Sequence, residues 1–144
     1  MKLFFLLTIT LRLISSIAYA QQVAKCDMTN CLETSKKVGH LRQQEMIDFL
    51  LTFGEECRDN VEYSEWSNEI LLELLEKQTE LTVKTITLQS KRLDIMAILK
   101  NLEEPLHDRF DLPAIIAKVQ KIKVNSDIKD EMISRLKIAD AKRN

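Results

Sequence analysis

The chain has 144 residues, of which 45% are hydrophobic and 30% are charged, and its 21 basic and 22 acidic residues leave a net charge of −1. This composition is typical of one globular domain, and it provides no strong field that would attract nucleic acid or an anionic membrane. Only two glycines are present. Because the phosphate-binding loops of Rossmann and P-loop proteins need several glycines, nucleotide sites of those kinds are excluded.

Residues 1–20 have the pattern of a cleavable signal peptide. Lys2 precedes an apolar stretch, and Ala18 and Ala20 stand at the two positions that a signal peptidase inspects. A membrane anchor is the alternative, but a spanning helix needs about 20 apolar residues, and Arg12 interrupts this stretch. We therefore expect a secreted or periplasmic protein. Cleavage would leave 19 basic and 22 acidic residues, a net charge of −3, and no second long apolar run for stable membrane insertion.

Residues 21–40 are predicted to form an N-terminal arm that carries Cys26 and Cys31, and Cys57 follows the first long helix. Three cysteines in an oxidising compartment predict one disulfide and one free thiol. We expect Cys57 to be paired, with Cys31 as the favoured partner and Cys26 as the alternative, and a small-loop Cys26–Cys31 bridge also stays open. The chain has no C-x-x-C motif and no second cysteine pair, so neither redox exchange nor a zinc site is favoured.

The apolar residues of the segment 41–144 recur at helical spacing, which predicts a single all-helical domain. The first helix is expected over about 41–53, where Gly54 ends it, and the second over about 65–78, where Ser64 caps it. The buried face of the second helix is predicted to comprise Trp66, Ile70, Leu71, Leu74 and Leu75.

The stretch 82–88 is rich in β-branched residues, which favours a strand, but no partner strand is visible, so we predict a helix there. Three more helices follow, with Ser90, Asp111 and Ser126 as their expected N-caps. The predicted fold class is therefore all-α, with about six short helices. Two arrangements stay open, namely a compact bundle and a small HEAT-like stack of helical hairpins, because helix starts recur at intervals near those of helical repeats.

Charge is unevenly distributed along the chain. Residues 55–80 contain nine acids and two bases, a net charge of −7, whereas residues 118–144 contain eight bases and four acids, a net charge of +4. The spacing of four glutamates places them on one face of the second helix; they are Glu65, Glu69, Glu73 and Glu76. This acidic stripe is interpreted as a solvated face, as a docking face for a basic partner, or as the internal counterpart of the basic C-terminal helix.

The sequence offers little for catalysis. It has no serine-nucleophile motif, and its two histidines, His40 and His107, lie in unrelated contexts. Glu103 and Glu104 are adjacent, so they point to different sides of a helix and are a weak acid–base pair. No cofactor, metal or nucleic-acid site is predicted. The favoured function is therefore non-catalytic contact with an unknown protein partner, although whether the chain is an enzyme stays open.

Two alternatives remain. The first is a carrier that binds an apolar ligand between its helices, in a cavity lined by Phe49, Phe53, Trp66, Ile70 and Leu74. The second is a hydrolase that uses carboxylates in a pattern the sequence does not reveal.

Overall fold

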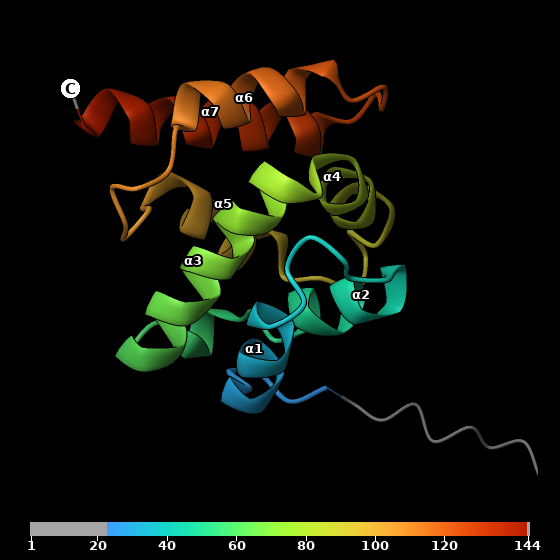
Figure 1. The fold of residues 1–144 in the computed structure, drawn as a ribbon, viewed down its shortest axis with the longest axis vertical. Coiled ribbons are helices and arrows are strands. Elements are labelled where there is room, and N and C mark those ends of the chain that lie inside the picture. Colours follow the sequence, from blue (N-terminus) through green and yellow to red (C-terminus); the bar gives the residue numbers. More distant parts are fainter. Residues whose placement is uncertain (1–22, 144) are drawn as a thin grey trace, which may run out of the picture.

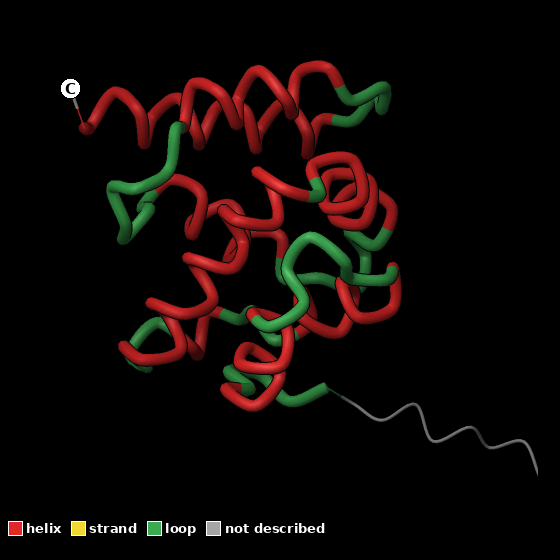
Figure 2. Tube along the Cα trace, viewed as in Figure 1, coloured by secondary structure: helices red, strands yellow, loops and turns green. Residues whose placement is uncertain are grey.

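The computed structural model describes residues 23–143, and the predicted signal peptide at 1–20 lies outside these residues. Within them the chain forms seven α-helices, one short 3-10 helix and no strand (Figure 2). The elements are α1 (Met28–Ser35), α2 (Gln43–Leu51), η1 (Glu55–Cys57), α3 (Val61–Lys77), α4 (Thr79–Leu88), α5 (Ile95–Glu103), α6 (Leu112–Lys121) and α7 (Asp127–Arg143). The all-helical fold class is confirmed, with one helix more than predicted.

The helices pack as a compact bundle. Helices α6 and α7 lie side by side at one end of the long axis, and α1 and α2 lie toward the other end (Figure 1). Between them, α3 packs against α1 and α4, while α4 also contacts α2 and α6, and α7 covers α5. Of the two predicted arrangements, a small helical bundle describes these contacts.

Side-chain caps explain where the helices begin. Asp111 accepts a hydrogen bond from the Ala114 amide, and Ser126 accepts one from the Ile128 amide, so both predicted caps are confirmed. Asn60 caps α3 in place of Ser64, so this helix begins earlier than predicted. Asp94 likewise caps α5 in place of Ser90. In both cases the N-cap is an Asn or Asp near the predicted serine.

The ambiguous stretch 82–88 is helical, as predicted, and belongs to α4. Its threonines are compatible with a helix because their hydroxyls bond to carbonyls of the preceding turn. Thr82 donates to the Gln78 carbonyl at 2.9 Å, and Thr87 donates to the Val83 carbonyl at 3.0 Å. Val83 and Ile86 are fully buried. Tertiary packing of this apolar side therefore outweighs the β preference of the segment.

The core runs through the whole bundle. Phe53 stacks edge to face on both Phe49 and Tyr63, with ring centroids 5.3 and 6.2 Å apart respectively. The predicted apolar face of α3 is buried with one exception. Trp66 is 38% exposed, so its assignment to that face is wrong. The helical turn places it at the edge of the buried face, next to the acidic side of the helix.

The disulfide joins Cys26 to Cys57, with a Cα–Cα distance of 5.5 Å, and Cys31 is a free thiol. The predicted pairing with Cys31 is therefore wrong. The reason is α1, a helix within the arm that was not predicted and that turns Cys31 into the core. Cys26 lies before that helix, where its amide donates to the Thr52 carbonyl at 2.9 Å and holds it near Cys57.

Candidate functional site

A cleft of about 770 Å³ opens between α3, α5 and the segment that contains η1. We call it the α3–α5 cleft. Its floor is made of buried residues, among them Phe53, Tyr63 and Leu99. At its mouth stand Met96, which is 67% exposed, and Leu106, which is 54% exposed. Large apolar side chains exposed at the edge of an apolar-floored cleft are typical of binding sites.

Among the polar residues that line the α3–α5 cleft is Asn68, which is buried and hydrogen-bonded within the fold. Its side-chain amide donates to the Asn101 carbonyl at 2.8 Å, and its carbonyl oxygen accepts from the Leu106 amide at 2.9 Å. These bonds hold the loop after α5 against α3. Asn68 therefore shapes the cleft and keeps no free hydrogen-bonding group for a ligand.

Other polar groups that line the cleft are also used within the fold. The Ser64 hydroxyl donates to the Cys57 carbonyl at 3.2 Å, and the Tyr63 hydroxyl shares a 2.7 Å hydrogen bond with Thr52. Asp94 is occupied by the cap of α5. The remaining charges lie at the rim and have both signs; Glu55, Arg58, Lys100 and Glu104 form no ion pair within residues 23–143.

Glu103 also borders the cleft, where it is the centre of an ion-pair cluster. Arg135 of α7 binds one of its carboxylate oxygens at 2.5 Å, and Lys142 approaches the other at 3.3 Å. The hydrogen bonds from these two cations lower the pKa of Glu103 below its ordinary value of about 4.5. The carboxylate is thus ionised at neutral pH, so it is unsuited to serve as a general acid.

The free thiol and the histidines do not supply a nucleophile and base to the cleft. Burial raises the pKa of Cys31 to about 12, which keeps the thiol protonated and unreactive. His107 lies outside the cleft, with Nε2 3.8 Å from Glu69 Oε2, and His40 precedes α2. Neither histidine lines the cleft, so what the cleft offers a ligand is apolar surface and a charged rim.

The predicted acidic stripe is partly neutralised within the fold. Arg109, from the loop between α5 and α6, contacts Glu69 at 2.7 Å and also binds Glu73, and Lys77 lies 3.9 Å from Glu73. The basic C-terminal helix makes its ion pairs elsewhere, with Glu103 and with the loop that follows α5. The prediction that the basic C-terminal helix neutralises the stripe is therefore wrong, and Arg109, which was not predicted, is the internal partner instead.

Arg143 of α7 fastens the same loop from its other side. Its guanidinium donates to the carbonyls of His107 and Phe110, the latter at 3.1 Å, and lies 3.6 Å from Asp108. The loop is thus held by α3 through Asn68 and by α7 through Arg143. Because Leu106 belongs to this loop, both helices position the mouth of the cleft.

The residues predicted to line a carrier cavity are mostly elsewhere. Phe49, Ile70 and Leu74 are buried in the packed core, and Trp66 lies at the surface. Of the five, only Phe53 borders the α3–α5 cleft. The cleft itself is assembled from four separate stretches of chain, which is why no periodic pattern revealed it.

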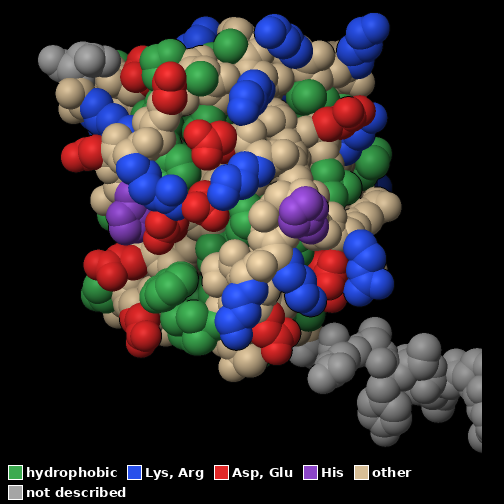
Figure 3. All heavy atoms as spheres, viewed as in Figure 1, with side chains coloured by type: hydrophobic (Ala, Val, Ile, Leu, Met, Phe, Trp, Pro, Cys, Tyr) green, Lys and Arg blue, Asp and Glu red, His purple; other side chains and the backbone are tan. Residues whose placement is uncertain are grey.

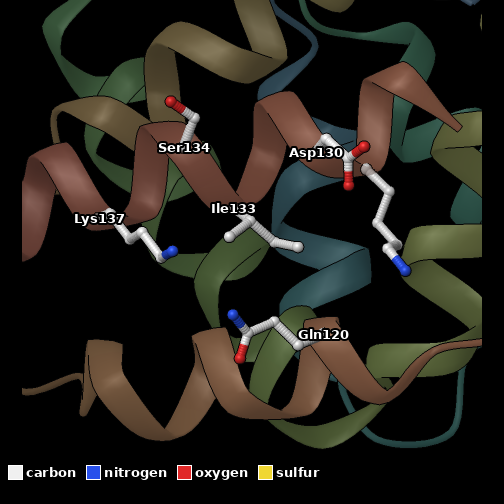
Figure 4. A pocket seen from close by; sticks show the side chains of 6 residues that line it. Gln120, Asp130, Ile133, Ser134 and Lys137 are labelled. Carbon is white, nitrogen blue, oxygen red and sulfur yellow. The ribbon is translucent and has the colours of Figure 1, made fainter.

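A second, smaller hollow of about 460 Å³ lies between α6 and α7, and we call it the α6–α7 groove. Figure 4 shows Ile133 of α7 and Gln120 of α6 pointing into the gap between the two helices. The groove is lined by Gln120, Lys129, Asp130, Ile133, Ser134 and Lys137. The lining side chains are polar or charged, with two lysines, except for the apolar side chain of Ile133.

Within residues 23–143, no helix is both long and apolar enough to cross a membrane, and no cluster of three metal-ligating side chains occurs. Comparison with known proteins found no matching family model, no similar curated protein and no similar solved structure.

Proposed function

We propose that this chain is an exported, non-catalytic helical protein that acts by binding a partner protein in the α3–α5 cleft. The observation that carries this proposal is the exposure of Met96 and Leu106 beside a floor of buried apolar residues. Most polar groups inside the cleft are bonded within the fold, so apolar contact is what remains for binding. The rim charges of both signs suit a protein segment, whose own charged groups can pair with them.

Export is supported by the signal-peptide pattern of the sequence and by the disulfide, which persists in oxidising compartments. Mass spectrometry of protein purified from its host tests this part. We expect a chain that begins at Gln21, and an intact Met1 in the cytosolic fraction would contradict export.

Site-specific photocrosslinking in the host tests partner binding. A benzophenone side chain at position 96 should give a defined protein adduct, whose crosslinked peptide is rich in apolar residues. Leu88 of α4 is a matched control, because it is 69% exposed, as Met96 is 67% exposed, but does not line the cleft. Equal adducts at both positions, or none at position 96, would contradict the proposal. A small apolar molecule that copurifies and is lost in a Leu99→Asp variant would support the carrier alternative.

A further inference from the structure

The two ends of the molecule carry opposite charge. Residues 55–65 hold five carboxylates against one guanidinium, a net charge of −4, whereas residues 118–137 hold six bases against three acids, a net charge of +3. The start of α3 lies toward the lower end of the long axis, and α6 and α7 form the upper end (Figure 1). Figure 3 shows acidic side chains at the lower left and lysines or arginines along the upper edge.

At the acidic end, the outer side of α3 exposes an apolar residue pair. Trp66 is the only tryptophan of the chain, and Val61 is 67% exposed. Glu62 and Glu65 lie beside them, both are exposed, and neither forms an ion pair within residues 23–143. These four residues form what we call the Trp66 face. Tryptophan is among the residue types that contribute most to binding at interfaces.

At the basic end, the α6–α7 groove has the complementary pattern. Lys129, Ile133 and Lys137 are four residues apart, so they follow one line along α7 with the half-buried isoleucine between the two ammonium groups. Lys129 also donates to the Ile122 carbonyl at 3.0 Å, which fixes its position, while Lys137 has no ion-pair partner in the described part of the chain. Asp130 is the one acidic residue of the groove.

We propose that the Trp66 face of one molecule docks into the α6–α7 groove of a second copy. Trp66 would cover Ile133, and the carboxylates of Glu62 and Glu65 would approach the groove lysines. Because the two surfaces differ and lie at opposite ends of the long axis, the contact is head to tail, and the pair of molecules keeps one free surface of each kind. Association therefore continues into chains. Neither surface includes residues of the α3–α5 cleft, so this inference does not depend on the proposed function.

Sedimentation velocity of the purified, disulfide-bonded protein tests self-association. At low salt, the weight-average mass should rise with protein concentration beyond that of a dimer. At about 0.5 M salt the rise should be largely lost, because screening shortens the range of the charges to a few ångström. Trp66→Ala should abolish association, whereas Leu88→Ala, which removes an equally exposed apolar side chain elsewhere, should leave it unchanged.

Charge reversal identifies the two surfaces. The pair Glu62→Lys with Glu65→Lys and the pair Lys129→Glu with Lys137→Glu should each be monomeric alone, and an equimolar mixture of the two should associate again. If the loss of the Lys129 contact impairs folding, as judged by circular dichroism, Lys137→Glu alone replaces the second pair.

Three outcomes would overturn the proposal. The first is a wild-type protein that stays monomeric at low salt at every concentration. The second is association that persists in Trp66→Ala or in the charge-reversed variants. The third is a mixture of the two reversed variants that does not associate.

Discussion

The α1–α2 end and the α5–α7 end of this bundle are stabilised by different means. At the first end, a disulfide, the Phe49–Phe53–Tyr63 ring cluster and the Thr52–Tyr63 hydrogen bond lie close together. At the second end, no disulfide is present in the described helices. There α7 is joined to α5 by buried aliphatic side chains and by the arginine contacts with Glu103 and the following loop.

This difference separates the conditions to which each end responds. A reducing agent acts on the disulfide, which within the described residues only the first end has, whereas partly exposed ion pairs respond to pH and salt. The α6–α7 groove lies wholly at the α5–α7 end, and the α3–α5 cleft includes residues of α5. These two surfaces therefore depend in part on the end that lacks covalent support, whereas the Trp66 face lies at the start of α3, toward the α1–α2 end.

A matched pair of core truncations should have the largest effect. Leu50→Ala and Leu136→Ala each remove a fully buried leucine, one from each end. Each should cost about 2–5 kcal/mol of unfolding free energy through lost burial and the cavity that remains. Hydrogen exchange should then distinguish the ends, because Leu136→Ala should expose α5–α7 amides while α1 and α2 stay protected. Equal loss of protection throughout the chain in both variants would show that the two ends unfold as one unit.

Removal of the disulfide should have the next largest effect. The Cys26–Cys57 bond spans 31 residues, and closing a loop of this length stabilises by about 3.5 kcal/mol through the entropy of the unfolded chain. Cys26→Ser with Cys57→Ser should lower the denaturation midpoint accordingly. Reducing agent should shift the wild type by a similar amount and leave the double variant unchanged. A further shift of the double variant would mean that the reductant acts elsewhere.

One link between the ends is made by Asn68, which joins α3 to the loop after α5. In Asn68→Ala the Leu106 amide and the Asn101 carbonyl lose their partner, which should cost about 2 kcal/mol. Asn101→Ala is the control, because that side chain donates only to the Ala97 carbonyl of its own helix. Urea denaturation measures the unfolding free energy of both variants. Equal destabilisation would contradict the role of Asn68 as the connector of the loop to α3.

Acid should have the smallest effect, and it should act on an ion pair at each end. Hydrogen bonds from Arg42 and Lys37 lower the pKa of Glu45 at the N-terminal end to about 2, and those from Arg135 and Lys142 lower the pKa of Glu103. Since both carboxylates are depressed in the folded state, their stabilisation is complete above the ordinary value of about 4.5 and is lost as pH falls through the folded pKa. Glu45→Gln and Glu103→Gln should each flatten the dependence of Tm on pH below about 4.5. An unchanged slope in either variant would contradict its ion pair.

The sequence was sufficient to predict the fold class and most helices, because helical periodicity and capping are local. It placed Asp111 and Ser126 correctly as caps. It missed α1, whose residues are mostly polar, and therefore chose the wrong partner for Cys57. Periodicity also does not show which edge of a helical face stays exposed, and for that reason Trp66 was misassigned.

The candidate site was less predictable because it is formed by distant segments. Arg109 contacts Glu69 across 40 positions of the chain, and Asn68 meets Leu106 across 38. Neither contact leaves a local pattern. The four glutamates do lie along one face of α3, as their spacing predicts. Two of them, Glu69 and Glu73, are neutralised by Arg109, which belongs to a loop distant in sequence.

Burial of Cys31 has a consequence for how the protein acquires its disulfide. Three cysteines allow three alternative pairings, and before folding each of them is accessible to an oxidant. Once α1 packs, the remaining thiol is inaccessible, and its pKa of about 12 leaves almost no thiolate to attack the Cys26–Cys57 bond. The folded protein therefore protects its disulfide from exchange with its own third cysteine, because Cys31 is neither accessible nor ionised once the fold has formed.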